Sequence, residues 1–137
     1  CDPKEWIDDP DDFNRSLTDQ ARVQACRLAL RMPELRIPNQ LQGVVDLYDV
    51  ADDWIPIYDK SDLPGFYMAV GTSGNQYKNA PVVGKLMAAL ITACEQGRDH
   101  DEAPLTFHLE KINRDIDLGF YSRLREINAE SSFSVLG

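Results

Sequence analysis

The chain has 137 residues, of which 43% are hydrophobic and 27% charged, and its formal net charge is −9. This composition is typical of a folded globular chain of about one domain and argues against wholesale disorder. The acidic balance argues against a nucleic-acid or anionic-membrane partner, because either would need a basic face. No apolar run approaches the roughly 20 residues that span a bilayer, so no membrane span is expected.

The three cysteines, Cys1, Cys26 and Cys94, are too widely spaced for a disulfide framework or a zinc pattern. No metal site is therefore predicted, and a cytoplasmic location is the simplest interpretation. The chain opens on Cys1-Asp2-Pro3 without a methionine. We expect it to begin partway through a longer protein.

A helix is predicted over residues 16–32, where apolar side chains recur at spacings of three and four. Ser16 is the expected N-cap, and Pro33 marks the end. The predicted apolar stripe consists of Leu17, Ala21, Ala25, Leu28 and Met32.

Strand signals follow between residues 38 and 63. Residues 41–50 and 55–58 are the predicted strands, with a turn at Asp52-Asp53 between them. Residues 66–70 form an uninterrupted apolar run, which favours a strand buried on both faces.

The best-signalled helix comes next, over residues 79–97. Asn79 is a candidate cap, Pro81 suits the first turn, and Gly97 is a natural stop. Residues 98–104 read as a charged linker in which His100 is expected to be exposed. Residues 105–109 and 116–121 are predicted as strands or an irregular return, and His108 as a packed or capped histidine.

The turn segment, residues 71–78, lies directly between the apolar run and this helix. Its backbone N–H groups and the positive end of the helix dipole suit an anionic or carbonyl-bearing ligand. Lys78 opposes the dipole there, which is better tolerated if an anion such as a substrate carboxylate is nearby. The spacing matches neither a Walker motif nor a GxGxxG fingerprint.

Several blocks in order resemble the C-terminal part of FAD-dependent amine oxidoreductases of the D-amino-acid oxidase, sarcosine oxidase and glycine oxidase-like superfamily. The resemblance covers about residues 28–92. The blocks are Leu47-Tyr48-Asp49-Val50, Asp53-Trp54-Ile55-Pro56-Ile57, Leu63-Pro64-Gly65-Phe66-Tyr67 and Gly71-x-Ser73-Gly74-x-x-x-Lys78-x-Ala80-Pro81-x-x-Gly84.

The resemblance implies that the turn segment closes a flavin site and stabilises charge on the reduced flavin. It also implies that Lys78 pairs with a substrate carboxylate, while Tyr48 and Asn75 are candidate substrate contacts. Tyr48 is equally well explained as a packing residue. The implied FAD-contacting residues are Gly71, Thr72, Ser73, Gly74, Asn75, Gln76, Tyr77 and Lys78. No residue is assigned as catalytic.

The chain departs from the family at Asn75-Gln76, where His-Gly is usual, which leaves the substrate open. FAD is expected to be non-covalent, because no cysteine lies near Asp46. A GxGxxG unit, which this fold needs for the FAD pyrophosphate, does not occur. The chain is therefore predicted to be a C-terminal fragment, inactive and without FAD by itself, whose partner is the missing N-terminal part of the same protein.

The predicted fold class is α/β, or an α+β fragment. Residues 1–63 would belong to a substrate-binding domain, residues 64–97 to the last strand and helix of an FAD-binding domain, and residues 98–137 to a C-terminal extension. The whole protein would oxidise the C–N bond of an amino acid or secondary amine. The alternative is a non-catalytic interaction or dimerisation module with exposed strand edges, and a homo-oligomer is possible under either hypothesis.

Overall fold

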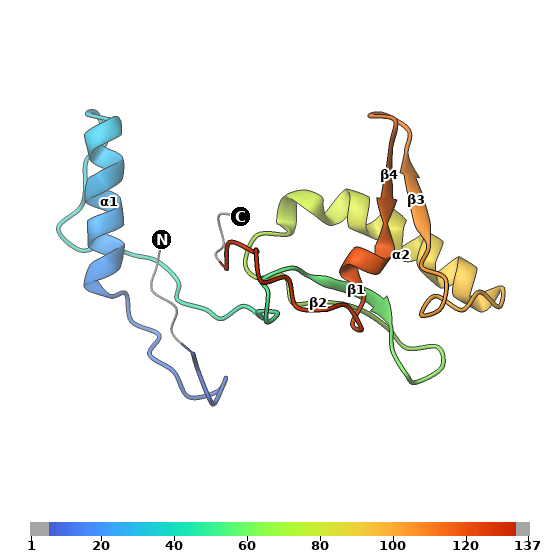
Figure 1. Ribbon diagram of the computed structural model, residues 1–137. Helices are drawn as coiled ribbons and strands as arrows, with labels where there is room; N and C mark the ends of the chain where they lie inside the picture. The colour runs from blue at the N-terminus through green and yellow to red at the C-terminus, as the bar shows by residue number, and fades with distance from the viewer. Residues whose placement is uncertain (1–5, 134–137) are drawn as a thin grey trace. The chain divides into compact units, whose positions relative to one another are not determined.

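The computed structural model of the chain describes residues 6–133 (Figure 1). It divides into two compact units, Cys1–Leu47 and Tyr48–Gly137, each described here by itself. The described residues contain two α-helices and two small antiparallel sheets of two strands each. The prediction of a mixed fold of helices and antiparallel strands is confirmed.

Unit 1 contains helix α1 (Asp19–Arg31). Its end before Pro33 is confirmed: Met32 has φ −128° and ψ 82°, in keeping with the exclusion of α conformation before a proline. The predicted N-cap at Ser16 is wrong. Ser16 instead donates its backbone N–H to Oδ1 of Asn14 (3.0 Å), a local turn that delays the helix.

The predicted strand over residues 41–50 is also wrong. Both sheets of the described chain lie in unit 2, so this segment has no strand beside it in its own unit. Only Val50, already within unit 2, forms a single bridge, to Thr72. Gly43 instead runs close to Leu17: a Cβ there would lie 3.2 Å from a Leu17 methyl carbon.

Unit 2 begins with a hairpin of β1 (Ile57–Lys60) and β2 (Tyr67–Val70). Ile57 pairs with Val70 and Lys60 with Tyr67. The strand expected at residues 66–70 is therefore present, but the prediction that it is buried on both faces is wrong. Its side chains range from half-buried to exposed, because the strand belongs to a two-stranded hairpin and not to a layered sheet.

The second hairpin pairs β3 (Thr106–Leu109) with β4 (Arg114–Asp117), followed by the short 3₁₀-helix η2 (Leu118–Tyr121). Asn113 takes the left-handed φ of 49° that the tight connection needs. His108 lies directly opposite Asp115, and their side chains meet at 2.6 Å. His108 is thus capped by a carboxylate at the surface.

Helix α2 (Ala80–Glu95) follows the one-turn 3₁₀-helix η1 (Tyr77–Asn79). Pro81 in its first turn is confirmed, and Gly97, at φ 93°, ends the helix by donating to the Cys94 carbonyl (2.9 Å). Asn79 precedes the helix but makes no side-chain cap bond.

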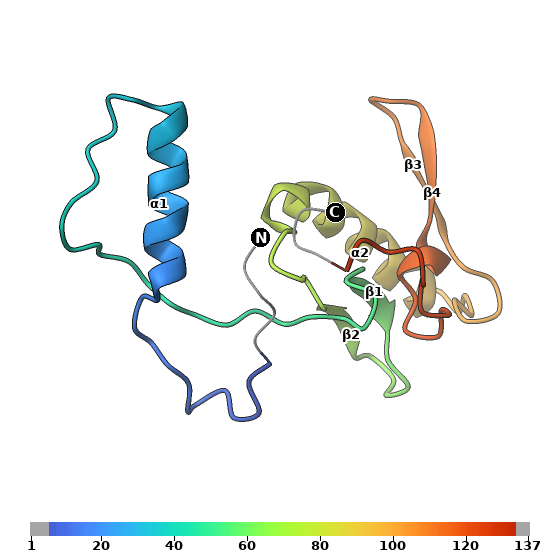
Figure 2. The same ribbon diagram turned by 60° about the vertical axis from the view of Figure 1, so that its left-hand side comes forward.

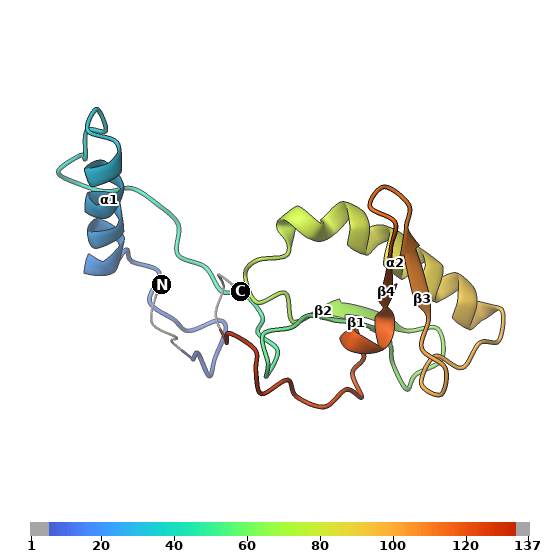
Figure 3. The same cartoon turned by 45° about the horizontal axis from the view of Figure 1, so that its top comes forward.

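The core of unit 2 joins α2 to the second hairpin. Leu86 and Leu90 of α2 pack on Leu118, and all three are almost completely buried. Figures 2 and 3 show α2 running alongside β1 and β2, with β3 and β4 beside its C-terminal half. The surrounding partly buried side chains are Met87, Cys94, Leu105, Phe107 and Ile116.

Candidate functional site

The turn segment leads from the end of β2 into η1 and α2. Gly71, Ser73 and Gly74 have positive φ values of 67°, 51° and 75°. Two of these positions also lack space: a Cβ on Gly71 would lie 3.0 Å from Cβ of Ala51, and one on Gly74 would lie 3.2 Å from the Tyr48 ring. Glycine is needed at both for conformation and for close approach.

Asp49 holds the first half of the turn segment. Its carboxylate accepts hydrogen bonds from the backbone N–H of Gly71 and from the N–H (3.2 Å) and hydroxyl (2.7 Å) of Thr72. Its carbonyl accepts the N–H of Ser73 at 2.9 Å. Three successive N–H groups of the predicted ligand-binding turn are therefore engaged by Asp49, two of them by its carboxylate and the third by its backbone carbonyl.

These bonds outweigh the effect of burial on the carboxyl. Burial raises the pKa of Asp49, but the hydrogen bonds from Thr72 and Gly71 together hold it below its ordinary value. Asp49 is consequently a charged, fixed support for the turn. The second half, residues 74–78, is the part that Asp49 does not engage.

A groove of about 410 Å³ lies in front of this second half. Its walls come from both strands of the first hairpin, from the turn segment and from the start of α2. The turn residues in its wall are Thr72, Gly74, Gln76 and Tyr77, and the other lining residues are Tyr58, Ala69, Ala80 and Val83. The lining combines small and apolar side chains with a few hydrogen-bonding groups, as in ligand sites generally.

The Gln76 amide is the centre of a small hydrogen-bond network in the groove. Its Oε1 accepts the Tyr58 hydroxyl (3.0 Å) and Nδ2 of Asn79 (2.8 Å). Its Nε2 donates to Oδ1 of Asn75. Gln76 therefore ties β1, the turn segment and η1 together at one point.

Tyr58 is itself firmly placed. It is 3% exposed, and its ring contacts that of Tyr121 at a centroid distance of 5.1 Å. Burial, together with Tyr121, raises the pKa of Tyr58 to about 12. The phenol accordingly keeps its proton at neutral pH and remains a donor.

Lys78 and Tyr48, two of the three residues predicted to contact substrate, lie on the turn segment or against it. Lys78 is exposed in η1 and forms no salt bridge with any residue between 6 and 133. The Tyr48 ring packs on Gly74 and meets Trp54 edge-on at 6.4 Å. Neither lines the groove, so their predicted contacts with a carboxylate stay predictions.

The C-terminal segment is fastened to the loop before β1 through Asp53. This buried carboxylate accepts two hydrogen bonds from the Arg125 guanidinium (2.7 and 3.1 Å) and one from the N–H of Asn128. The Asp53 carbonyl accepts the Ser131 hydroxyl. Burial raises the pKa of Asp53, but the bonds from Arg125 and the backbone lower it overall.

A second charged cluster lies at the far end of β1. Arg123 meets Asp59 (3.2 Å), Asp101 (2.8 Å) and Asp62 (2.5 Å), and Lys60 meets Asp101 at 2.6 Å. Hydrogen bonds from Arg123, and secondarily Lys60, hold the pKa of Asp101 far below its ordinary value. Sequence reasoning did not find this cluster, because its members are charged residues without a shared spacing.

The prediction that His100 is exposed is wrong. The side chain is 1% exposed, its Nδ1 accepts the N–H of Leu105 (3.1 Å), and its Nε2 lies 3.7 Å from Oδ1 of Asp59. Burial lowers the pKa of His100 even though Asp59 opposes that effect. The linker folds back onto β1, a contact that the local charge pattern does not reveal.

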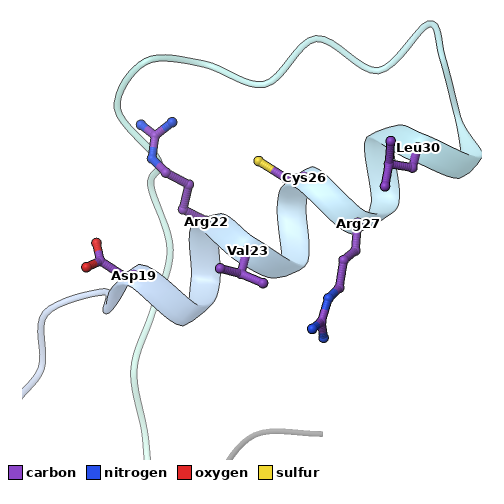
Figure 4. A pocket seen from close by; sticks show the side chains of 6 residues that line it. All are labelled: Asp19, Arg22, Val23, Cys26, Arg27 and Leu30. Carbon is purple, nitrogen blue, oxygen red and sulfur yellow. The ribbon is translucent and has the colours of Figure 1, made fainter.

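A separate hollow of about 440 Å³ lies on α1 in unit 1 (Figure 4). Figure 4 shows Arg22 and Cys26 on one side of the helix and Arg27 on the other. The polar groups therefore do not converge on one point. The groove at the turn segment, where several polar groups meet, is the better candidate site.

Comparisons with known proteins gave no match: no family model, no curated protein and no solved structure is similar to the chain. Within residues 6–133, no helix is long and apolar enough to cross a bilayer. The same residues contain no group of three or more His, Cys, Asp or Glu side chains placed to hold a metal ion.

Proposed function

We propose that the chain is the C-terminal portion of an FAD-dependent oxidoreductase that oxidises the C–N bond of an amino acid or secondary amine. The observation that carries the proposal is the turn segment itself. Hydrogen bonds to Asp49 fix the first half of the segment. A groove lined by amide, hydroxyl and small apolar groups borders the second half. The sequence resemblance supplies the cofactor class and the reaction type.

The lining of the groove fits one side of a planar, carbonyl-bearing ring. Ala69, Gly74 and Ala80 leave room for a flat ligand, and Gln76 supplies a hydrogen-bonding amide. FAD, when bound, supplies the acceptor for the hydride equivalent that leaves the substrate C–N bond. The chain's own part is to orient the ring edge and the substrate.

Within this proposal, the residues of the turn segment have different roles. Gly71, Thr72 and Ser73 donate their backbone N–H groups to Asp49, which assigns them to support. Gly74, Gln76 and Tyr77, which line the groove, would face the ligand. Lys78, exposed and without a salt bridge among the described residues, would pair with the substrate carboxylate.

The test is made in the polypeptide that joins this chain to the predicted N-terminal FAD-binding part. We expect that polypeptide to show flavin absorbance after purification, and Lys78→Met to raise the amino-acid KM about ten- to a hundredfold, the loss of one charge-assisted hydrogen bond. Flavin content should stay near that of the wild type. Lys85→Met, on the exposed side of α2, is the matched control.

Three results would count against the proposal in different ways. A polypeptide without flavin would remove the family assignment. An unchanged KM in Lys78→Met would remove the carboxylate role of Lys78 alone. Tight FAD binding by the 137-residue chain by itself would contradict the fragment interpretation.

A non-catalytic interaction or dimerisation module remains the second candidate, favoured by exposed apolar side chains at the first hairpin. Phe66 is 55% exposed, and Val70 of β2 is also exposed. Sedimentation of the 137-residue chain tests this candidate. A concentration-dependent dimer combined with a flavin-free longer polypeptide would favour it.

A further inference from the structure

The Gln76 amide in the groove has one hydrogen-bonding group left over. A primary amide has two acceptor lone pairs and two N–H donors. Tyr58 and Asn79 occupy both lone pairs of Oε1, and Asn75 takes one N–H. One N–H of a half-buried side chain in the groove wall therefore has no partner among residues 6–133.

The orientation of this amide is fixed by its neighbours. Exchanging its oxygen and nitrogen would set an NH₂ group against Nδ2 of Asn79 and an oxygen against Oδ1 of Asn75. Both contacts would then join groups of the same kind, which costs the desolvation of each unpaired group. With Asn75 and Asn79 oriented as they stand, the network thus selects one orientation of the Gln76 amide.

Tyr58 is the most buried member of the network. Its hydroxyl reaches Gln76 from β1, 18 residues earlier in the chain, and its ring is held by Tyr121 of η2. Because Asn79 lies only three residues beyond Gln76, it moves with the turn. Tyr58 therefore sets the direction of the amide relative to the hairpin.

We propose that the remaining N–H of Gln76 donates a hydrogen bond to an acceptor oxygen of the ligand in the groove, and that Tyr58 is the positioning residue that aims it. The acceptor is a carbonyl of the cofactor ring or a carboxylate oxygen of the substrate. The inference rests on the proposed function. It adds a side-chain donor at a position where the family resemblance leads one to expect glycine.

The experiment uses the flavin-containing polypeptide and the variants Gln76→Glu and Tyr58→Phe. Gln76→Glu keeps the shape of the side chain but replaces its donors with an anionic oxygen. We expect about a ten- to hundredfold loss in either FAD affinity or substrate KM, and about a fivefold loss of the same quantity in Tyr58→Phe. Gln96→Glu, an exposed residue at the end of α2, controls for the added charge.

Two separate measurements identify the acceptor. A weaker FAD dissociation constant with an altered flavin spectrum assigns the donor to the cofactor, and a raised KM with unchanged FAD affinity assigns it to the substrate. The double variant distinguishes an effect of Tyr58→Phe through the orientation of Gln76 from a general loss of folding. Since Tyr58 acts through Gln76, adding Tyr58→Phe to Gln76→Glu should cause little further loss.

The possible results of these measurements distinguish failure of the Gln76 role from failure of the proposed function. If the wild-type polypeptide binds flavin and turns over, but Gln76→Glu matches the Gln96→Glu control in both measurements, the role of Gln76 is refuted and the function stands. If adding Tyr58→Phe to Gln76→Glu causes a further loss of FAD affinity or a further rise in KM as large as that of Tyr58→Phe alone, the positioning role of Tyr58 is refuted. A wild-type polypeptide without flavin overturns both proposals.

Discussion

Residues 6–47 and residues 48–133 use their apolar side chains in different ways. Helix α1 in the first region contains no buried residue, and Leu28 on its predicted apolar stripe is 48% exposed. Every buried residue of the described chain lies in the second region, where Leu90 and Leu118 are completely enclosed. Both regions contain an amphipathic helix, but among the described residues only α2 contributes buried side chains to a core.

The second region is held together by contacts between residues far apart in the chain. The Asp59 carboxylate accepts the Ser122 hydroxyl across 63 residues, and Asp53 accepts Arg125 across 72. Such contacts bring the loop before β1, the hairpins and the C-terminal segment into one unit. An amphipathic stripe therefore specifies a helix, while burial depends on which other elements reach that stripe.

The largest expected difference in the free energy of unfolding is between truncating a core leucine of the second region and truncating an exposed leucine of the first. Leu90→Ala should lower the free energy of unfolding by about 2–5 kcal/mol, because it empties an enclosed site. Leu28→Ala should change it by less than about 0.5 kcal/mol, as expected for an exposed side chain. Urea unfolding in a Trp6→Phe background, followed by the fluorescence of Trp54, measures both in the 137-residue chain.

Equal losses of unfolding free energy in Leu90→Ala and Leu28→Ala would show that Leu28 is buried in solution. Such a result would contradict the difference in burial between the two regions. Trp54 is a suitable reporter because it is the second of only two tryptophans and is 9% exposed in unit 2. Trp6, by contrast, is exposed.

A smaller loss of stability is expected when Asp49, which holds the turn segment, is replaced. Asp49→Ala removes the acceptor of the Gly71 and Thr72 N–H groups and should cost about 1–3 kcal/mol, the penalty for leaving such groups unpaired. Asp52→Ala, an exposed neighbour, should be nearly neutral. Amide hydrogen exchange at Gly71 and Thr72, whose N–H groups lose their acceptor, gives the local readout.

Faster exchange at these two amides in Asp49→Ala, but not in Asp52→Ala, is the expected pattern. Unchanged exchange would show that Asp49 does not hold the turn. The whole-chain unfolding free energy alone would not make this distinction.

The smallest effect is a pH dependence that belongs to the second region. Burial raises the pKa of Asp53, but Arg125 and backbone donors lower it below the ordinary value of 3.8. A carboxyl with a lowered folded-state pKa contributes stability that is complete above its unfolded pKa and is lost as pH falls through the folded one. We therefore expect unit 2 to lose stability below about pH 4.

Arg125→Met should flatten this acid dependence, because it removes the guanidinium that favours the charged form of Asp53. Arg27→Met on α1 is the matched control, since Arg27 forms no salt bridge among the described residues. Urea midpoints measured between pH 7 and pH 3 give the slopes. If the urea midpoint of Arg125→Met depends on pH as steeply as that of the wild type, Arg125 does not lower the pKa of Asp53.

Local sequence signals predicted the parts of the site that depend on local conformation. Pro81 and Gly97 marked the beginning and end of α2, and the segment after the apolar run was predicted to be a turn between strand and helix. The predicted strand over residues 41–50 was wrong because β-branched and aromatic residues indicate a strand without identifying a partner strand. His100 was misplaced because burial depends on the rest of the fold.

The sequence by itself determined the order of strand, turn segment and helix, because glycine, proline and apolar spacing act within a few residues of one another. Only the tertiary structure decided which backbone N–H groups of the turn segment are already bonded within the chain. Asp49 engages Gly71 and Thr72 from 22 and 23 residues away, and Tyr58 reaches Gln76 across 18. Hydrogen bonds of this kind depend on how distant elements fold together, which no local pattern encodes.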